Sequence, residues 1–256
     1  MIINSRVFGK SDNKLIILHG FLGSLDNWIT IAKKISDLGF EVHVVDQRNH
    51  GKSFHSDKHS YELMSLDLKN YIEHFHFEKT SIIGHSMGGK TACCFALNHS
   101  NMVDKLIVVD ILPIKYNNDY NLIFKALRTI NLNSISNRYD IDNHLKKFFK
   151  DELFISFLSK NLVRSKDGGF RFKCNLLSLM NNIDNILDQI NSNIFYEGKT
   201  FFIKGLNSDY ITDEGLKRTQ VLFPNYNLIP VEEGGHWLHH EKQKDFFDIC
   251  NELLTT

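Results

Sequence analysis

The 256-residue sequence lacks the features that mark several special classes of protein. Its four cysteines include no C-x-x-C pair, which argues against both a zinc knuckle and a redox dithiol. Its formal net charge is zero, so composition gives no reason to expect nucleic acid or an anionic membrane as a partner. No apolar run approaches the length of a membrane span, and residues 1–10 lack the apolar stretch of a signal peptide. We therefore expect a cytoplasmic protein, with processing from an organelle precursor as the alternative.

Short apolar runs predict the strands of a sheet at residues 15–18, 42–45, 81–83, 106–109, 201–203 and 227–231. The first four runs are nearly continuous, which is typical of strands buried on both faces of a parallel sheet. Helical stretches lie between the runs, at about 26–38, 61–74, 88–98, 213–222 and 241–254. Strand alternating with helix predicts an α/β protein with a doubly wound, mostly parallel sheet.

The alternation breaks once, between Pro113 and Thr200, where no further strand of the sheet is expected. A structureless loop of this length is improbable in a compact domain, and the insert shows helical periodicity of its own. We therefore expect a core made of residues 1–113 and 199–256. Residues 114–198 should form a mostly helical cap over the carboxyl ends of the strands. The turn Asp167-Gly168-Gly169 predicts a small hairpin inside this cap.

The candidate nucleophile is Ser86, within the motif Gly84-His85-Ser86-Met87-Gly88. An apolar strand precedes the motif and a helical run follows it, which is the context of a nucleophile elbow. A serine in such a turn has a strained backbone and an exposed hydroxyl. Gly84 and Gly88 lack the side chains that would collide where strand and helix cross closely.

A serine hydroxyl needs a base beside it, and His236 is the candidate because it follows the last strand behind two glycines. A carboxylate must orient that imidazole, and two are placed to do so. Asp209 follows the strand at 201–203, whereas Asp110 ends the strand at 106–109. Ligands of such sheets bind at the carboxyl ends of the strands, so either carboxylate could reach His236.

The oxyanion of an acyl-transfer intermediate needs backbone N–H donors aimed at it. In this architecture we expect one from Met87 and one from the loop His19-Gly20-Phe21-Leu22-Gly23, with Phe21 preferred and Leu22 as the alternative. His19 should shape that loop, and His85 should pack against or orient the site. His55 and His59 are interpreted as part of a solvated face. Asp46 is expected to organise Arg48 and Gly51.

Blocks in order along nearly the whole chain resemble the α/β-hydrolase superfamily, and within it the YbfF-type bacterial esterases, which are related to a mitochondrial α/β-hydrolase-domain protein. The blocks are residues 19–28, 46–53, 84–90, 109–113 and 235–239. The resemblance implies an esterase or thioesterase acting on short to medium acyl chains. It also favours Asp110 as the acid, since members of this subgroup often lack the acid after the later strand and use the Asp of D-I-x-P instead.

We expect no cofactor and no metal, a small-molecule acyl ester or thioester as substrate, and a monomer or homodimer. A carbon–carbon bond hydrolase or a cofactor-free peroxidase would use the same three residues. A protein of another class, a ligand-binding α/β-hydrolase fold without turnover, is disfavoured because Ser86, His236, a carboxylate and the oxyanion loop are all present.

Overall fold

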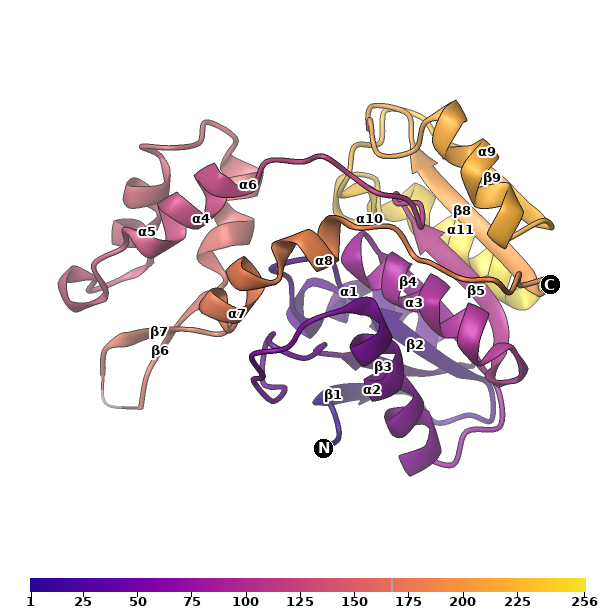
Figure 1. Cartoon of the computed structure of the whole chain (residues 1–256). Helices are drawn as coiled ribbons and strands as arrows, with labels where there is room; N and C mark the ends of the chain where they lie inside the picture. The colour runs from indigo at the N-terminus through magenta and orange to yellow at the C-terminus, as the bar shows by residue number, and fades with distance from the viewer. Residues whose placement is uncertain (167) are drawn as a thin grey trace.

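A computed structural model describes residues 1–166 and 168–256, and its centre is a seven-stranded sheet (Figure 1). The strands are β1 (Ser5–Phe8), β2 (Lys14–Leu18), β3 (Glu41–Val45), β4 (Thr80–His85), β5 (Val103–Val109), β8 (Lys199–Gly205) and β9 (Tyr226–Val231). Their order is β1-β3-β2-β4-β5-β8-β9, and every pair is parallel except β1 with β3. The doubly wound, mostly parallel sheet is confirmed, with β1 as an additional antiparallel edge strand.

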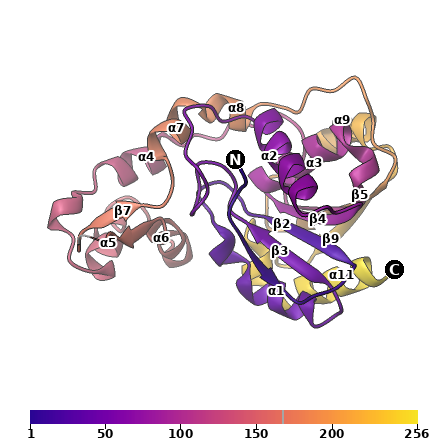
Figure 2. The same ribbon diagram turned by 90° about the horizontal axis from the view of Figure 1, so that it is seen from below.

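Helices cover both faces of the sheet, as Figure 2 shows. One face carries α1 (Ile29–Ser36) and α11 (Gln243–Thr255), and the other carries α2 (Tyr61–His74) and α3 (Met87–Asn98). Each face has its own cluster of buried apolar side chains. The strand sequences are apolar at nearly every position because successive side chains pack alternately into these two clusters. The remaining core helices are α9 (Asp213–Leu222) and α10 (Leu238–Glu241), with the short 3-10 turns η1 (Leu25–Asn27) and η2 (Ser100–Met102).

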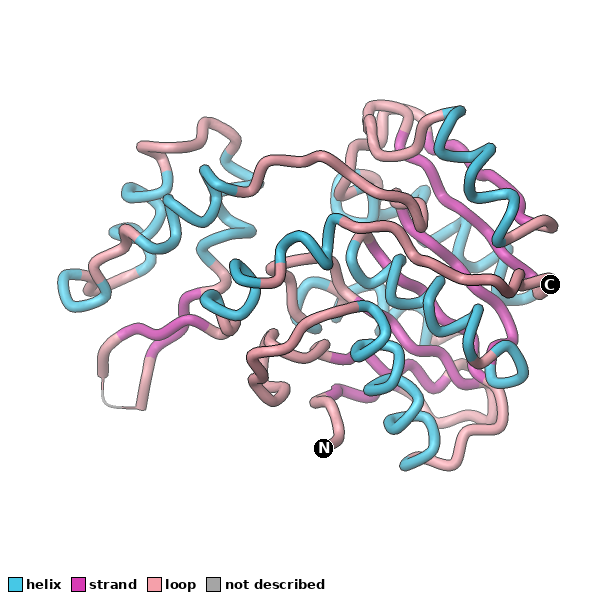
Figure 3. The backbone as a smooth tube through the Cα atoms, in the orientation of Figure 1, coloured by secondary structure: helices cyan, strands magenta, loops and turns pink. Residues whose placement is uncertain are grey.

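The chain between β5 and β8 is mostly helical and lies beside the sheet (Figure 3). It holds α4 (Asn121–Arg128), η3 (Leu132–Ser134), α5 (Arg138–Leu145), α6 (Glu152–Ser159), α7 (Leu176–Asn181) and α8 (Ile183–Leu187). Between α6 and α7, β6 (Leu162–Arg164) pairs antiparallel with β7 (Phe170–Phe172), which is the hairpin expected from the sequence. Asp167 of its predicted turn lies outside the described residues.

Lys90 of α3 ties this segment to the core at both of its ends. Its buried ammonium donates to the carbonyl oxygens of Ile114, where the segment begins, and of Ile186 and Asp188, where it returns. Burial lowers the pKa of Lys90 to about 7, while the nearby charge of Asp188 opposes that shift. No helix in the described parts of the chain is both long and apolar enough to cross a membrane.

Candidate active site

Ser86 lies on a strained turn between β4 and α3. Its backbone has φ 52° and ψ −120°, a region that non-glycine residues rarely adopt. Two neighbouring glycines make the turn sterically possible, because a Cβ on Gly84 would lie 2.3 Å from the Gly88 oxygen and one on Gly88 would lie 2.4 Å from the Leu18 oxygen. The close strand–helix crossing inferred from the motif is therefore present, and Ser86 opens into a cavity.

Asp110 follows β5 and holds the ring of His236. The His236 Nδ1 lies 2.8 Å from the Asp110 Oδ2, and the Asp110 side chain is fully buried. Two further groups donate to the same carboxylate, the Gly205 amide at 3.1 Å and the Ser208 hydroxyl. A buried carboxylate is tolerated when donors surround it in this way. Asp110 also has a left-handed backbone, with φ 50°, held by a bond from its amide to the Ile203 oxygen.

Asp209, the other candidate acid, is exposed and makes no hydrogen bond or ion pair to His236 among the described residues. The loop after β8 contributes its neighbour Ser208 to the Asp110 carboxylate instead. Sequence reasoning identified this loop as part of the site but did not assign a role to Ser208. The sequence feature that could have identified Ser208 is its position at the end of a strand, next to Asp209.

His85 and Tyr210 hold His236 from two sides. The His85 Nε2 lies 2.8 Å from the His236 backbone oxygen, so the neutral His85 ring donates to it. Burial keeps the pKa of His85 well below its usual value, which favours that neutral form. The Tyr210 ring stacks on the imidazole of His236, with 3.9 Å between centroids and 16° between planes. His85 therefore orients the site, as expected, while Tyr210 was not anticipated from the sequence.

The loop after β2 presents a free backbone amide to the cavity. The Gly20 oxygen accepts from the Gly23 amide at 2.9 Å and from the His19 Nδ1 at 2.8 Å. Those bonds fix the plane of the Gly20–Phe21 peptide, and in a trans peptide the Phe21 N–H points the opposite way. Among the described residues, the amides of Phe21 and Met87 have no hydrogen-bond partner. The expected role of His19 in shaping this loop is confirmed.

Leu22 is held in the same loop by both of its backbone groups. Its amide donates to the His50 Nε2 at 3.2 Å, and its oxygen accepts from the Asn161 side chain at 2.8 Å. The Leu22 backbone is left-handed, with φ 57°. Because its N–H is already engaged, Leu22 is a poorer oxyanion donor than Phe21. Asn161 lies between α6 and β6, so the inserted segment contacts this loop directly.

Other residues differ from the sequence-based interpretation. His59 is not on a solvated face: it is 1% exposed, and burial lowers its pKa to about 3. Arg48 pairs with Asp67, at 2.5 and 2.7 Å, rather than with Asp46. Asp46 instead accepts from the amides of Leu25 and Lys52, and a Cβ on Gly51 would overlap its carboxylate. The expectation that Asp46 organises the turn at Gly51 is confirmed, whereas those for Arg48 and His59 were wrong, because spacing along the chain does not reveal which element covers a side chain.

The candidate site opens into a cavity of about 500 Å³. Its lining includes Ser86, His236 and the loop 19–23 after β2, and α6 contributes Phe154, Phe157 and Leu158 from the inserted segment. Its lining mixes apolar rings with polar and charged side chains, among them Asp26, Asn118, Lys160 and Glu241. In the described parts of the chain, no cluster of three or more His, Cys, Asp or Glu side chains is arranged to hold a metal ion.

Comparison with known proteins identifies the family. A family model described as the alpha/beta hydrolase fold matches residues 13–243. A solved structure described as a marine microorganism esterase has a TM-score of 0.95 and 40% sequence identity, covering 98% of this chain and 99% of that one. The sn-1-specific diacylglycerol lipase ABHD11 of Danio rerio is 35% identical, covering 93% of this chain and 77% of the relative. Esterase YbfF of Escherichia coli is 29% identical over 91% of this chain and 89% of its own length.

The chain belongs to the alpha/beta hydrolase fold family. Within that family it is an enzyme with named esterases and a lipase among its relatives, and the expected resemblance to the YbfF-type esterases is confirmed.

Proposed function

We propose that the protein is a serine esterase that hydrolyses short- to medium-chain acyl esters or thioesters through Ser86, His236 and Asp110. The observation that carries the proposal is the 2.8 Å contact between His236 and Asp110, beside a serine on a strained turn that faces the same cavity. Related proteins named as an esterase and a lipase favour ester substrates over the carbon–carbon bond and peroxidase chemistries that the same residues could support.

The proposed reaction uses each group in a defined role. With Nδ1 donating to Asp110, the His236 Nε2 is left to take the Ser86 proton as the hydroxyl attacks the acyl carbon. The Phe21 and Met87 amides stabilise the oxyanion. The tetrahedral intermediate then expels the alcohol or thiol, which takes the proton from His236, and an acyl-enzyme remains. Water, activated by His236, cleaves the acyl-enzyme and releases the carboxylic acid and Ser86.

We further propose that residues 114–198 act as a cap that selects the substrate. The support is that α6 lines the cavity and that Asn161 reaches the oxyanion loop. One fold can host many functions, so substrate choice depends on the residues that line the site and not on the scaffold. We therefore expect the cap to decide which substrates enter the cavity.

The test is turnover of p-nitrophenyl esters from acetate to dodecanoate, together with labelling by a fluorophosphonate probe. Ser86→Ala should lose about four to six orders of magnitude in rate and all labelling, because it removes the nucleophile. Ser156→Ala is the matched control, since Ser156 is an exposed serine of α6 that lines the same cavity. Near-wild-type activity of Ser86→Ala would overturn the proposal.

A further inference from the structure

We propose that the preferred substrates join a short acyl group, acetyl or propionyl, to a bulky and largely apolar alcohol, because two cavities of very different size meet at Ser86 and only the large one contains His236. This inference rests on the proposed esterase function and specifies its substrate class.

The large cavity can hold a sizeable apolar group. Its volume of about 500 Å³ lies in the range of small-molecule binding sites. Trp237, the residue after the proposed base, packs against two aromatic rings of α6, with centroids 5.6 Å from Phe154 and 5.7 Å from Phe157. These three rings line the same cavity as His236, and aromatic rings offer flat faces to an aromatic or hydrocarbon group.

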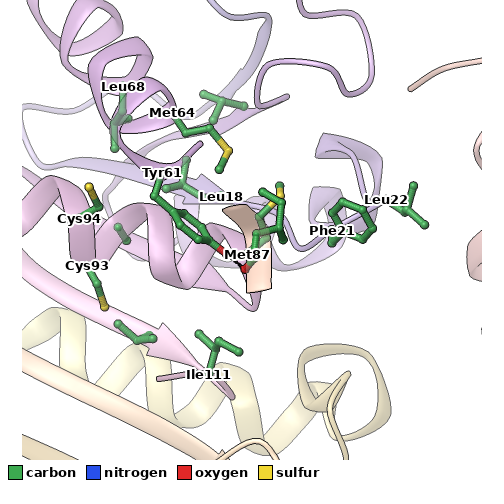
Figure 4. Close-up of a cluster of buried hydrophobic side chains, with 14 of the residues drawn as sticks. Leu18, Phe21, Leu22, Tyr61, Met64, Leu68, Met87, Cys93, Cys94 and Ile111 are labelled. Atoms are coloured by element: carbon green, nitrogen blue, oxygen red, sulfur yellow. Dashed lines mark hydrogen bonds between the residues drawn. The ribbon is translucent and has the colours of Figure 1, made fainter. Parts of the chain in front are cut away.

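The small cavity also reaches Ser86 and is bounded by Met87 and Lys90 of the first turn of α3. Its volume is about 20 Å³, close to the room that one water-sized probe needs. Its lining includes Tyr61, Ile111 and Leu187, together with Phe21 and Met87, whose amides lie at its mouth beside Ser86 in the proposed reaction, and it does not include His236. Figure 4 shows the Tyr61 ring beside Met87, with Ile111 apart from them. A methyl or ethyl group fits this space, whereas a longer chain does not.

The walls of the small cavity are held in place by their polar tips. The Tyr61 hydroxyl donates to the Ile186 oxygen at 2.7 Å, and the Tyr116 hydroxyl donates to the Tyr210 oxygen at 2.9 Å. The Lys90 ammonium, which also lines this cavity, donates to the Ile114 oxygen at 3.1 Å. The polar atoms of these side chains are therefore bound to backbone oxygens, which fixes the walls of the cavity. Enlarging it would break buried hydrogen bonds, which opposes expansion around a longer chain.

The position of the base decides which half of the ester occupies which cavity. The leaving oxygen must lie within reach of His236 to take its proton, so the alcohol half occupies the large cavity. The oxyanion faces the Phe21 and Met87 amides. The remaining substituent of the reacting carbon, the acyl chain, is then directed towards the small cavity.

Two isomeric esters test this orientation with the same atoms and the same ring. We expect kcat/KM for 2-phenylethyl acetate to exceed that for methyl 3-phenylpropanoate, in which the ester is reversed, by about tenfold or more. We also expect the acetate to exceed 2-phenylethyl butanoate by about tenfold or more, because two additional methylenes do not fit the small cavity.

Two leucine variants test the cavity assignment. Leu187→Ala removes three carbons from the wall of the small cavity, more than the two that butanoate adds, so it should bring the butanoate rate to at least that of the acetate. Leu153→Ala is the control, because Leu153 is an exposed residue that lines the large cavity. It should leave the acetate-to-butanoate ratio within about twofold of wild type.

The outcomes separate this inference from the proposed function. Preference for methyl 3-phenylpropanoate, equal rates for acetate and butanoate, or a shift in acyl preference with Leu153→Ala but not Leu187→Ala would overturn the substrate class while the esterase stands. Labelling of Ser86 by a fluorophosphonate without turnover of any of these esters would also overturn the substrate class. Absence of both labelling and turnover would overturn the esterase itself, and the inference with it.

Discussion

Two features of Asp110 are energetically unfavourable and are not expected of a residue without a function. It is a fully buried carboxylate, and it has a left-handed backbone with φ 50°. Positions of this kind cost of order 1–3 kcal/mol each and cluster at functional sites. Ser86, with φ 52° and ψ −120°, and Leu22, with φ 57°, also have a positive φ within the same site. Ser86 and Asp110 end neighbouring strands, β4 and β5, which brings the proposed nucleophile and the proposed acid to one edge of the sheet.

The choice between the two carboxylates gives a sharp prediction at the residue scale. Asp110→Asn should lower kcat/KM by about four orders of magnitude, because an amide at this position favours the wrong tautomer of His236. Asp209→Asn should stay within about twofold of wild type, since its side chain is exposed and does not contact His236. Steady-state hydrolysis of p-nitrophenyl acetate by the two variants makes the comparison, with circular dichroism to show that both are folded. Small and equal losses would contradict the assignment of Asp110.

At the scale of elements, the oxyanion loop is held by three separate parts of the chain. Its own His19 fixes the Gly20 oxygen, His50 after β3 binds the Leu22 amide, and Asn161 of the inserted segment binds the Leu22 oxygen. A loop with two glycines would otherwise have much conformational freedom. The position of the proposed oxyanion donor therefore depends on the inserted segment as well as on the core.

Asn161 is expected to be a positioning residue that acts through Leu22. Asn161→Leu keeps the shape of the side chain but removes the donor, so we expect kcat to fall by about tenfold to a hundredfold with KM within about threefold of wild type. The upper end approaches the loss of a whole oxyanion donor. The measurement is the kcat and KM for p-nitrophenyl esters, with the rate of fluorophosphonate labelling as a second readout.

Asn185→Leu provides the control for that variant. Asn185 also belongs to the inserted segment and donates to a core carbonyl, that of His59 at 3.1 Å, but it does not contact the oxyanion loop. It should leave kcat within about twofold. Equal losses of kcat in the two variants would mean that any loosening of the segment has this effect and that Asn161 has no specific role.

For the whole molecule, the sequence predicted the strands and helices that follow from local residue patterns. It did not predict which side chains are covered or paired by residues far away in the chain. The strands β2 to β5 were predictable because continuous apolar runs between polar segments are typical of buried strands. The edge strand β1 was missed because its four residues are only partly buried and show no strong alternation. The preference for Asp110 over Asp209 came from a resemblance, because strand ends alone place both carboxylates at the same edge. His59 was misassigned because its spacing from His55 does not show that a residue far along the chain, Asn185, contacts it.

Burial of histidines links the fold to pH. Six of the thirteen are buried with a pKa below the usual value: His19, His43, His50, His59, His85 and His239. Desolvation is the largest cause in every case. In the unfolded chain these rings take up a proton near pH 6.5, whereas in the folded protein they stay neutral to lower pH. Their contribution to stability is therefore complete above pH 6.5 and is lost as the pH falls below it.

His239 allows that linkage to be measured for a single ring. Burial lowers its pKa to about 3, and it stacks on Trp28 with 4.2 Å between centroids and 6° between planes. His239→Phe keeps an aromatic ring against Trp28 but cannot titrate. Between pH 7.5 and 5.5, urea unfolding should therefore show a loss of stability smaller than that of wild type by about 1.4 kcal/mol, the value of one pKa unit. The same loss in His239→Phe as in wild type would mean that this ring is protonated in the folded protein at pH 5.5.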